Sequence, residues 1–162
     1  MYQFITGNIF NSNAHTLVDA VNCLGIKGAG LALQFKQNFP KSFEHYRAHC
    51  RDGAMQPGKV LISSEEGGLS IVHFPTKIDW RNPSKLEWIE SGLEDLIHQV
   101  NTRQIQSIAI PQLGCGLGGL NWVDVRALII AAAERMPNCR VEIYGAAPLS
   151  VARPLVKIRN RK

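Results

Sequence analysis

The sequence predicts an α/β domain in which helices cover both faces of a central sheet. Strand-like and helix-like segments alternate along most of the 162 residues, and this alternation is typical of the α/β class. Two glycine clusters each follow an expected strand and precede an expected helix. The length and a hydrophobic content of 45% suffice for one buried core. We therefore expect one domain over residues 1–150, followed by a basic tail over residues 151–162.

The first half of the chain is expected to contain four strands and two helices. Short apolar and β-branched runs predict the strands, and polar or glycine-containing turns separate them. Leu31 to Asn38 has a helical pattern. Pro40 suits the first position of a second helix that ends near Arg51, because the N–H that proline lacks is unpaired there in any case. The expected strands are residues 2–6, 17–22, 59–63 and 69–74.

Two helices and two strands are expected in the second half. Ser84 and Glu87 have the spacing of a capping box, in which each side chain bonds a free backbone N–H at a helix start. Asn121 can cap the helix expected over residues 122–136. The remaining strands are expected over residues 107–111 and 139–144. The apolar residues that recur at helical spacing behind the capping box are Leu86, Ile89, Leu93, Leu96, Ile97 and Val100.

Composition excludes several classes of protein. No apolar run approaches the roughly 18 residues of a membrane span, and the first residues lack the basic and apolar regions of a secretory signal. The four cysteines form no Cys-x-x-Cys pair, so we expect neither a zinc ribbon nor a disulfide framework, and a cytoplasmic location. The net charge of +5 is carried by the last ten residues, so it does not mark the folded body as a nucleic-acid-binding surface.

Both glycine clusters have the features of an anion site. Gly25 to Gly30 and Gly114 to Gly119 each lie between a strand and a helix, where backbone N–H groups and the helix N-terminus attract negative charge. Glycine also lets a diphosphate approach the backbone closely. Two such loops in one small domain suggest a ligand whose diphosphate lies between them. Either loop alone is explained equally well as a tight strand-to-helix turn.

The second cluster matches the dinucleotide-binding fingerprint only formally. Gly114, Gly116 and Gly119 have the required spacing, and Glu142 follows roughly 20 residues later. A Rossmann fold uses this motif in its first βαβ unit, whereas here only one expected helix and one expected strand follow it. Glu142 also lies within its expected strand rather than at the end. The sequence therefore argues against nicotinamide redox chemistry.

Four separated motifs resemble, in the right order, those of the macrodomain family. They are Thr6 to Ile9, Ala20 to Gly25, Gly28 to Ala32 and Gly114 to Gly118. Within that family, three further segments resemble the branch of terminal ADP-ribose protein glycohydrolases and of DNA ADP-ribosyl glycohydrolase antitoxins of the DarT/DarG type. These segments are residues 27–35, Phe74 to Lys77 with Trp80 and Arg81, and residues 113–122. The likeness covers about residues 1–147.

The resemblance implies a three-layer α/β/α fold around a mixed sheet, with ADP-ribose lying across the strand ends and no other cofactor. It places Asn8 and Ile9 near the adenine and Asn22 near the distal ribose. Asn8 stands where an aspartate is more usual; its side-chain carbonyl still accepts a hydrogen bond from the adenine amine, and we expect softer adenine selectivity. The implied ligand-binding residues are Asn8, Ile9, Lys27, Gly28, Ala29, Gly30, Leu31, Gly114, Cys115, Gly116, Leu117 and Gly118.

Gly118 separates two substrate classes within this branch. The protein-directed glycohydrolases carry an aspartate at the position of Gly118, whereas the DNA-directed antitoxins have glycine there. The resemblance therefore implies removal of ADP-ribose from thymidine in DNA, by hydrolysis of the N-glycosidic bond, as the antitoxin activity of a toxin–antitoxin pair. One alternative is hydrolysis of ADP-ribosyl esters on protein or of O-acetyl-ADP-ribose. The other is a reader module that binds ADP-ribose without turnover.

Lys77 is the implied catalytic residue, and Asn22 would orient the ribose hydroxyls beside it. A lysine on a loop is usually a solvated side chain, so this role depends on the match of the segment Phe74 to Lys77. The ammonium can donate a proton to the leaving base, or a free amine of lowered pKa can attack the anomeric carbon; the sequence leaves both open. Trp80 and Arg81 can stack on or clamp a nucleic-acid strand, or pack as ordinary loop residues.

The other reactive side chains are expected to be structural. Cys23 and Cys115 lie in the binding segments without an evident base partner, so we interpret them as buried loop cysteines. His45 and His49 have a spacing that can bind zinc, but no third ligand is evident and no metal is expected. The implied partners are ADP-ribosylated DNA and a cognate ADP-ribosyltransferase toxin, which related antitoxins usually contact through a second domain. We expect a monomer with no membrane partner.

Overall fold

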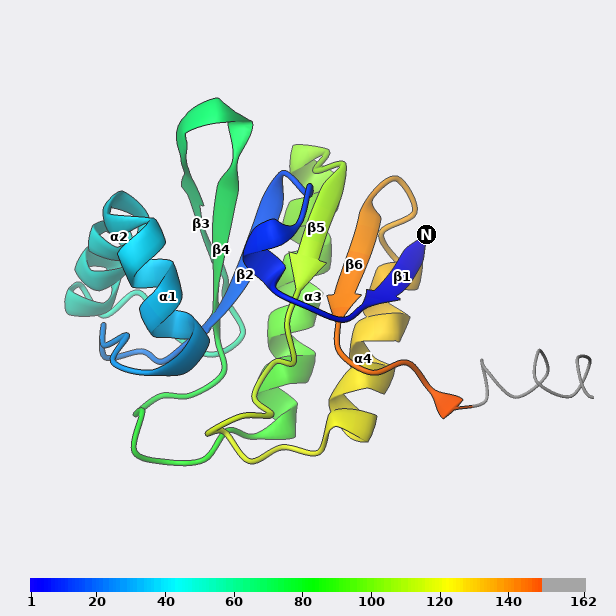
Figure 1. The fold of residues 1–162 in the computed structure, drawn as a ribbon. Coiled ribbons are helices and arrows are strands. Elements are labelled where there is room, and N and C mark those ends of the chain that lie inside the picture. The colour runs from blue at the N-terminus through cyan, green and yellow to red at the C-terminus, as the bar shows by residue number, and fades with distance from the viewer. Residues whose placement is uncertain (150–162) are drawn as a thin grey trace, which may run out of the picture.

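A computed structural model describes residues 1–149, which form a six-stranded sheet packed between helices (Figure 1). The strands are β1 (Tyr2–Ile5), β2 (Thr16–Val21), β3 (Leu61–Ser64), β4 (Ser70–Pro75), β5 (Ser107–Ile110) and β6 (Arg140–Tyr144). The helices are α1 (Gly30–Asn38), α2 (Pro40–Arg51), α3 (Leu86–Arg103) and α4 (Trp122–Glu134), with short 3-10 helices η1 (Ile9–Asn11) and η2 (Glu66–Gly68).

The sheet is mixed, and its strand order is β1-β6-β5-β2-β4-β3. Only β3, at one edge, runs antiparallel to its neighbour, β4; the other neighbouring strands pair in parallel. The five parallel strands therefore end along the same edge of the sheet. In open α/β sheets ligands bind outside these carboxyl ends.

Helices cover both faces of the sheet. Successive side chains along a strand point to opposite faces, so they pack alternately against the helices on one face and on the other. On β2, Leu17 and Val21 pack in the clusters under α1 and α2, whereas Val18 packs under α3 and α4. The cluster under α3 and α4 is the largest and contains most of the buried apolar residues. Figure 1 shows these two helices together behind the strands. The predicted three-layer α/β/α fold with a mixed sheet is confirmed.

The expected strands and helices are present, with most boundaries within two residues of the predicted ones. Pro40 is the first residue of α2. The Asn121 side chain caps α4 by accepting a hydrogen bond from the Val123 N–H at 2.8 Å, as predicted. Sequence analysis did not anticipate η1, where Asn8 Oδ1 accepts from the Phe10 N–H at 3.0 Å.

The predicted capping box at Ser84 is wrong. Helix α3 begins at Leu86, its N-cap is Lys85, and no side chain caps it. The Ser84 hydroxyl is buried and has no hydrogen-bond partner in the described part of the chain. The reason is tertiary: the Ser84 N–H donates to the Gly118 carbonyl at 3.0 Å, which holds this residue beneath the second glycine loop instead of at the helix start.

No helix within residues 1–149 is both long enough and apolar enough to cross a membrane. The predicted basic tail, residues 151–162, lies outside the described residues.

Candidate functional site

A cavity of about 950 Å³ opens at the carboxyl ends of the parallel strands. Its wall is built where β1, β2, β4, β5 and β6 end and by the first turns of α1. It therefore combines the two glycine loops with the segment that carries Lys77. From the predicted site the wall contains Asn8, Ile9, Asn22, Gly28, Ala29, Gly30, Leu31, Lys77, Trp80, Gly114, Gly116, Leu117 and Gly118.

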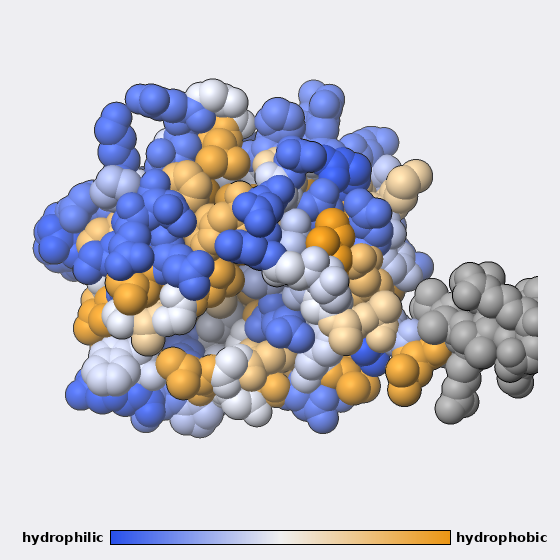
Figure 2. Space-filling model, in the orientation of Figure 1, coloured by the Kyte–Doolittle hydropathy of each residue, from blue (hydrophilic) through white to orange (hydrophobic). Residues whose placement is uncertain are grey.

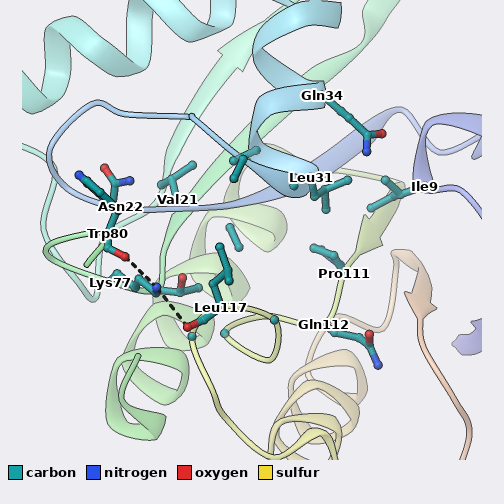
Figure 3. Close-up of a pocket in the computed structure, with 18 of the residues that line it drawn as sticks. Ile9, Val21, Asn22, Leu31, Gln34, Lys77, Trp80, Pro111, Gln112 and Leu117 are labelled. Carbon is teal, nitrogen blue, oxygen red and sulfur yellow. Dashed lines mark hydrogen bonds between the residues drawn. The ribbon is translucent and has the colours of Figure 1, made fainter. Parts of the chain in front are cut away.

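The labelled side chains divide the cavity into two ends (Figure 3). Asn22, Lys77 and Trp80 lie at one end, and Ile9, Gln34 and Gln112 lie at the other. The glycine loops approach the cavity between these ends. This order is what a long ligand with a central diphosphate requires.

The side chain of Asn22 organises the first glycine loop. Its Oδ1 accepts from the N–H groups of Leu24 and Ile26 at 3.0 and 3.3 Å, and its Nδ2 donates to the Ile26 carbonyl at 2.7 Å. The Tyr46 hydroxyl donates to Asn22 Oδ1 at 2.9 Å and to the Asn22 carbonyl at 2.8 Å. An amide has two N–H donors, so one N–H of Asn22 stays available to a ligand. The residue is therefore a loop anchor as well as a cavity residue.

The second glycine loop is compact and cannot accept a side chain at its centre. Gly114 has a φ of 73°, a backbone conformation that favours glycine. A Cβ at Gly118 would lie 2.4 Å from both the Gly114 carbonyl oxygen and the Ser84 hydroxyl. Within residues 1–149, the N–H groups of Gly116, Leu117 and Gly118 have no hydrogen-bond acceptor. Such unpaired N–H groups are suited to bind an anion.

Lys77 follows β4 and reaches across the cavity to the second loop. Its Nζ donates to the Trp80 carbonyl at 3.1 Å and to the Leu117 carbonyl at 3.3 Å (Figure 3). The Thr76 N–H donates to the Val21 carbonyl at 2.8 Å, which continues the pairing of β2 with β4 up to the lysine. The amine is thus placed between two loops that come from distant parts of the sequence.

Lys27, a predicted ligand-binding residue, is not in the cavity wall. Its ammonium points into the core under α1 and α2, where Nζ lies 2.7 Å from Asp19 Oδ2 and 3.2 Å from His73 Nδ1. It also lies 4.8 Å from the centre of the Tyr46 ring. A buried lysine needs a charge partner, and β2 supplies it directly beneath the loop.

Two other predicted contacts also lie outside the wall. Cys115 points away from the cavity, its thiol 3.5 Å from the Leu113 carbonyl, and burial raises its pKa. The Arg81 guanidinium donates to both Asp79 oxygens at 2.9 and 2.7 Å, and this pairing lowers the pKa of Asp79. Arg81 is thus already held by a carboxylate beside the cavity.

Other side chains with reactive groups have structural partners. Burial raises the pKa of the Cys23 thiol to about 12, so the nucleophilic thiolate is strongly disfavoured. His45 Nδ1 lies 2.7 Å from Ser63 Oγ. In the described part of the chain no group of three or more histidine, cysteine or acidic side chains could hold a metal ion.

Sequence reasoning missed cavity residues at the end opposite Lys77. Gln34 lies one helical turn after Leu31 on α1, and its spacing from Gly30 and Leu31 could have placed it on the same face. Tyr144 ends β6 beside Ile5 of β1 and also lines the cavity. Tyr144 was not predicted as a cavity residue, because the pattern of a strand does not show which strand ends lie side by side in the sheet.

The fold and the cavity define a macro domain. The family model described as Macro domain matches residues 18–129, and the chain belongs to this family. It is 39% identical over 147 residues to the DNA ADP-ribosyl glycohydrolase of Mycobacterium tuberculosis, a match covering 89% of this chain and 42% of that protein. It is 36% identical over 165 residues to the DNA ADP-ribosyl glycohydrolase of Thermus aquaticus, covering 99% and 46%.

Solved structures agree with this relationship. The macrodomain of Mycobacterium tuberculosis DarG has a TM-score of 0.87 and 38% identity, covering 91% of this chain and 99% of that one. Thermosipho africanus DarTG in complex with ADP-ribose has a TM-score of 0.83 and 32% identity, covering 91% and 43%. The predicted relationship to DarG macrodomains is confirmed. The chain spans less than half the length of these two DNA ADP-ribosyl glycohydrolases.

Proposed function

We propose that this domain is a DNA ADP-ribosyl glycohydrolase, which binds ADP-ribose in the cavity and hydrolyses its N-glycosidic bond to thymine in DNA. The observation that carries the proposal is the position of Lys77 at the Asn22 end of the cavity. Its amine lies between the loop after β4 and the second glycine loop. Relatives named DNA ADP-ribosyl glycohydrolases, at 36% and 39% identity, support the same reaction.

The proposed binding mode follows from the chemistry of the wall. The diphosphate lies against the unpaired N–H groups of Gly116 to Gly118 and the N-terminus of α1, where partial positive charge favours an anion. The adenine lies at the Ile9 end, where the carbonyl of Asn8 retains a second lone pair for the adenine amine. The distal ribose then reaches Asn22 and Lys77.

Lys77 acts in this proposal as the proton donor to the leaving base. An ammonium has three N–H donors, and two of them are directed at the Trp80 and Leu117 carbonyls. The third is directed to the base. As the bond between the anomeric carbon and the base nitrogen breaks, the base receives the proton and leaves neutral. Water adds to the anomeric carbon and returns a proton to the Lys77 amine, so the lysine is regenerated.

Gly118 favours this mechanism over one that uses a second carboxylate. Within residues 1–149 the cavity wall contains no aspartate or glutamate. A side chain at position 118 would meet the Gly114 carbonyl oxygen at 2.4 Å, so an aspartate there requires a different loop conformation. The loop as it stands therefore has no carboxylate of the kind that the protein-directed glycohydrolases carry at this position. This supports a nucleobase, rather than an ester on protein, as the leaving group.

The decisive experiment compares Lys77→Ala with the wild type on an ADP-ribosylated thymidine oligonucleotide. We expect turnover to be abolished, while the affinity for free ADP-ribose, measured by calorimetry, changes little. Lys59→Ala is the matched control, because Lys59 is also a loop lysine but is exposed and does not line the cavity. Full activity of Lys77→Ala would remove the lysine from the mechanism.

A protein carrying ADP-ribosyl glutamate, tested in parallel, separates the remaining functions. Turnover of this ester but not of modified DNA would assign the chain to protein substrates. Binding of ADP-ribose without turnover of either substrate would make it a reader module. We expect turnover of the DNA substrate.

The antitoxin role is part of the same proposal. A relative from Thermosipho africanus, 31% identical over 160 residues, is named a DNA ADP-ribosyl transferase–DNA ADP-ribosyl glycohydrolase fusion protein. A transferase and a glycohydrolase joined in one relative support a toxin partner for this domain. That toxin would add the ADP-ribosyl group to DNA, and this domain would remove it. In bacteria that express a DNA ADP-ribosyltransferase toxin, co-expression of the wild-type domain should restore growth, whereas co-expression of Lys77→Ala should not.

A further inference from the structure

Large apolar side chains surround the Lys77 end of the cavity. We call them the apolar rim; the residues are Leu24, Ile26, Ile78, Trp80 and Leu117. Leu117 is 83% exposed and the other four are between 45% and 50% exposed. Figure 2 shows orange, apolar side chains at the surface among the loops below α1. A group of exposed large apolar residues beside a cavity is typical of a binding surface rather than of ordinary solvent-exposed protein.

The rim residues come from the three loops that frame the amine. The Cys23 N–H donates to the Ile78 carbonyl at 3.0 Å, which joins the first loop to the segment after β4. Lys77 Nζ joins that segment to the second glycine loop through the Trp80 and Leu117 carbonyls. Ile26, Trp80 and Leu117 also line the cavity itself. The rim is therefore continuous with the place where the bond to ADP-ribose would break.

The charges next to the rim are already paired. Arg81, which is adjacent to Trp80, donates to both Asp79 oxygens, and its guanidinium carbon lies 5.5 Å from the centre of the Trp80 ring. Arg47, which lies beside Gly25, pairs with Glu44 at 2.8 Å. Apolar and aromatic surface, rather than a cluster of unpaired cations, thus lies beyond Lys77. Such a surface suits the flat face of a nucleobase better than a phosphate or a carboxylate.

We infer that the apolar rim is the subsite for the leaving nucleobase, with Trp80 as a stacking surface and Ile26 and Leu117 as apolar walls. This inference rests on the proposed function and assigns the side chains that recognise its leaving group. The rim holds the base by its faces, and the Lys77 ammonium meets its polar edge. The rim side chains therefore act on the substrate beyond the distal ribose, whereas the diphosphate meets the second glycine loop only through its backbone N–H groups.

The test uses ADP-ribosyl-thymidine, a nucleoside conjugate without any DNA backbone, beside the ADP-ribosylated oligonucleotide. Trp80→Ala and Leu117→Ala remove side chains but leave the backbone carbonyls that accept from Lys77. We expect each to raise the KM for both substrates about tenfold, as is usual when a base loses a stacking partner. The affinity of Trp80→Ala for free ADP-ribose should stay within about twofold of the wild type, since in this inference the indole meets only the base beyond the distal ribose. Val123→Ala is the matched control, because Val123 is an exposed apolar residue outside the cavity wall, and it should behave as the wild type.

The outcomes separate this inference from the proposed function. If the wild type does not turn over either substrate, the proposed function fails. If the wild type is active and the rim variants retain its KM, the rim does not bind the base and the inference is overturned. A raised KM for the oligonucleotide alone would assign the rim to neighbouring nucleotides, which also overturns it. Equal losses of affinity for substrate and for free ADP-ribose would show that the variants disturb the loops instead.

Discussion

Replacing Lys27 with methionine tests how far the first glycine loop depends on its buried ion pair. The side chains of Lys27 and Asp19 are 2% and 0% exposed, and their charged atoms are 2.7 Å apart. Removing one partner of a buried pair leaves the other charge uncompensated, at a cost of about 3–5 kcal/mol. We expect Lys27→Met to lower the free energy of unfolding by that amount near neutral pH.

The cost should depend on pH through Asp19. Burial raises the pKa of Asp19 from 3.8 to about 6, and the charge of Lys27 opposes this rise. A carboxyl whose pKa is raised on folding binds its proton more tightly in the native state, so stability falls as pH rises between the unfolded and folded pKa values. In the wild type this loss ends shortly above pH 6. Without Lys27 the pKa rises further, and the loss therefore continues above pH 6 at up to about 1.4 kcal/mol per pH unit.

His73 lies close to the Lys27 amine and, of the titratable groups around it, has the ordinary pKa nearest to this pH range, but it does not obscure the effect. Burial, the largest cause, and the charge of Lys27 lower the pKa of His73 well below 6.5, so the ring is neutral over this range. In Lys27→Met, burial still lowers the pKa of His73. The pH dependence of Lys27→Met should therefore report Asp19.

Urea denaturation at several pH values measures the prediction. The control is Lys27→Met combined with Asp19→Leu, since replacing both charges of a buried pair with apolar groups is often close to neutral. We expect the double variant to recover most of the stability and to lose the extra pH dependence. Parallel pH profiles for the wild type and Lys27→Met, or equal destabilisation in the single and double variants, would refute the reasoning.

The remaining predictions concern a glycine, a helix cap and a loop anchor. Gly118→Ala brings a Cβ to 2.4 Å from the Gly114 carbonyl oxygen; we expect a loss of about 1–3 kcal/mol in urea denaturation and weaker ADP-ribose binding by calorimetry. Asn121→Ala removes the side-chain cap of α4, so thermal unfolding should show a loss of about 1 kcal/mol, with ADP-ribose affinity unchanged. Tyr46→Phe removes the hydroxyl that donates to Asn22 at 2.8 and 2.9 Å; we expect about 1–3 kcal/mol of destabilisation and faster amide hydrogen exchange in the loop.

Local patterns were sufficient to predict most of the fold. Strand and helix periods located the elements, since each element buries one face or one stripe of its side chains. The capping-box motif at Ser84 failed because the Gly118 carbonyl, 34 residues away in the sequence, accepts from the Ser84 N–H. A motif of four residues carries no information about such a partner.

The candidate site could be predicted where it consists of backbone, and less well where it depends on side-chain direction. Glycines at a strand-to-helix turn identify a loop that a ligand can approach, and the cavity lies against both loops. Lys27 occupies the first loop but points into the core, because Asp19 on the strand beneath offers it a buried partner. The sequence shows both residues but not that they share one face of the sheet.

The hydrogen bonds of Asn22 have a practical consequence for ligand discovery. Because this side chain already ties together the backbone of Leu24 and Ile26, the receptor has little conformational freedom left to surrender when a small molecule arrives. Fragments should therefore bind here without rearranging the loop. Rigid compounds shaped to this part of the cleft should gain affinity mainly through preorganisation.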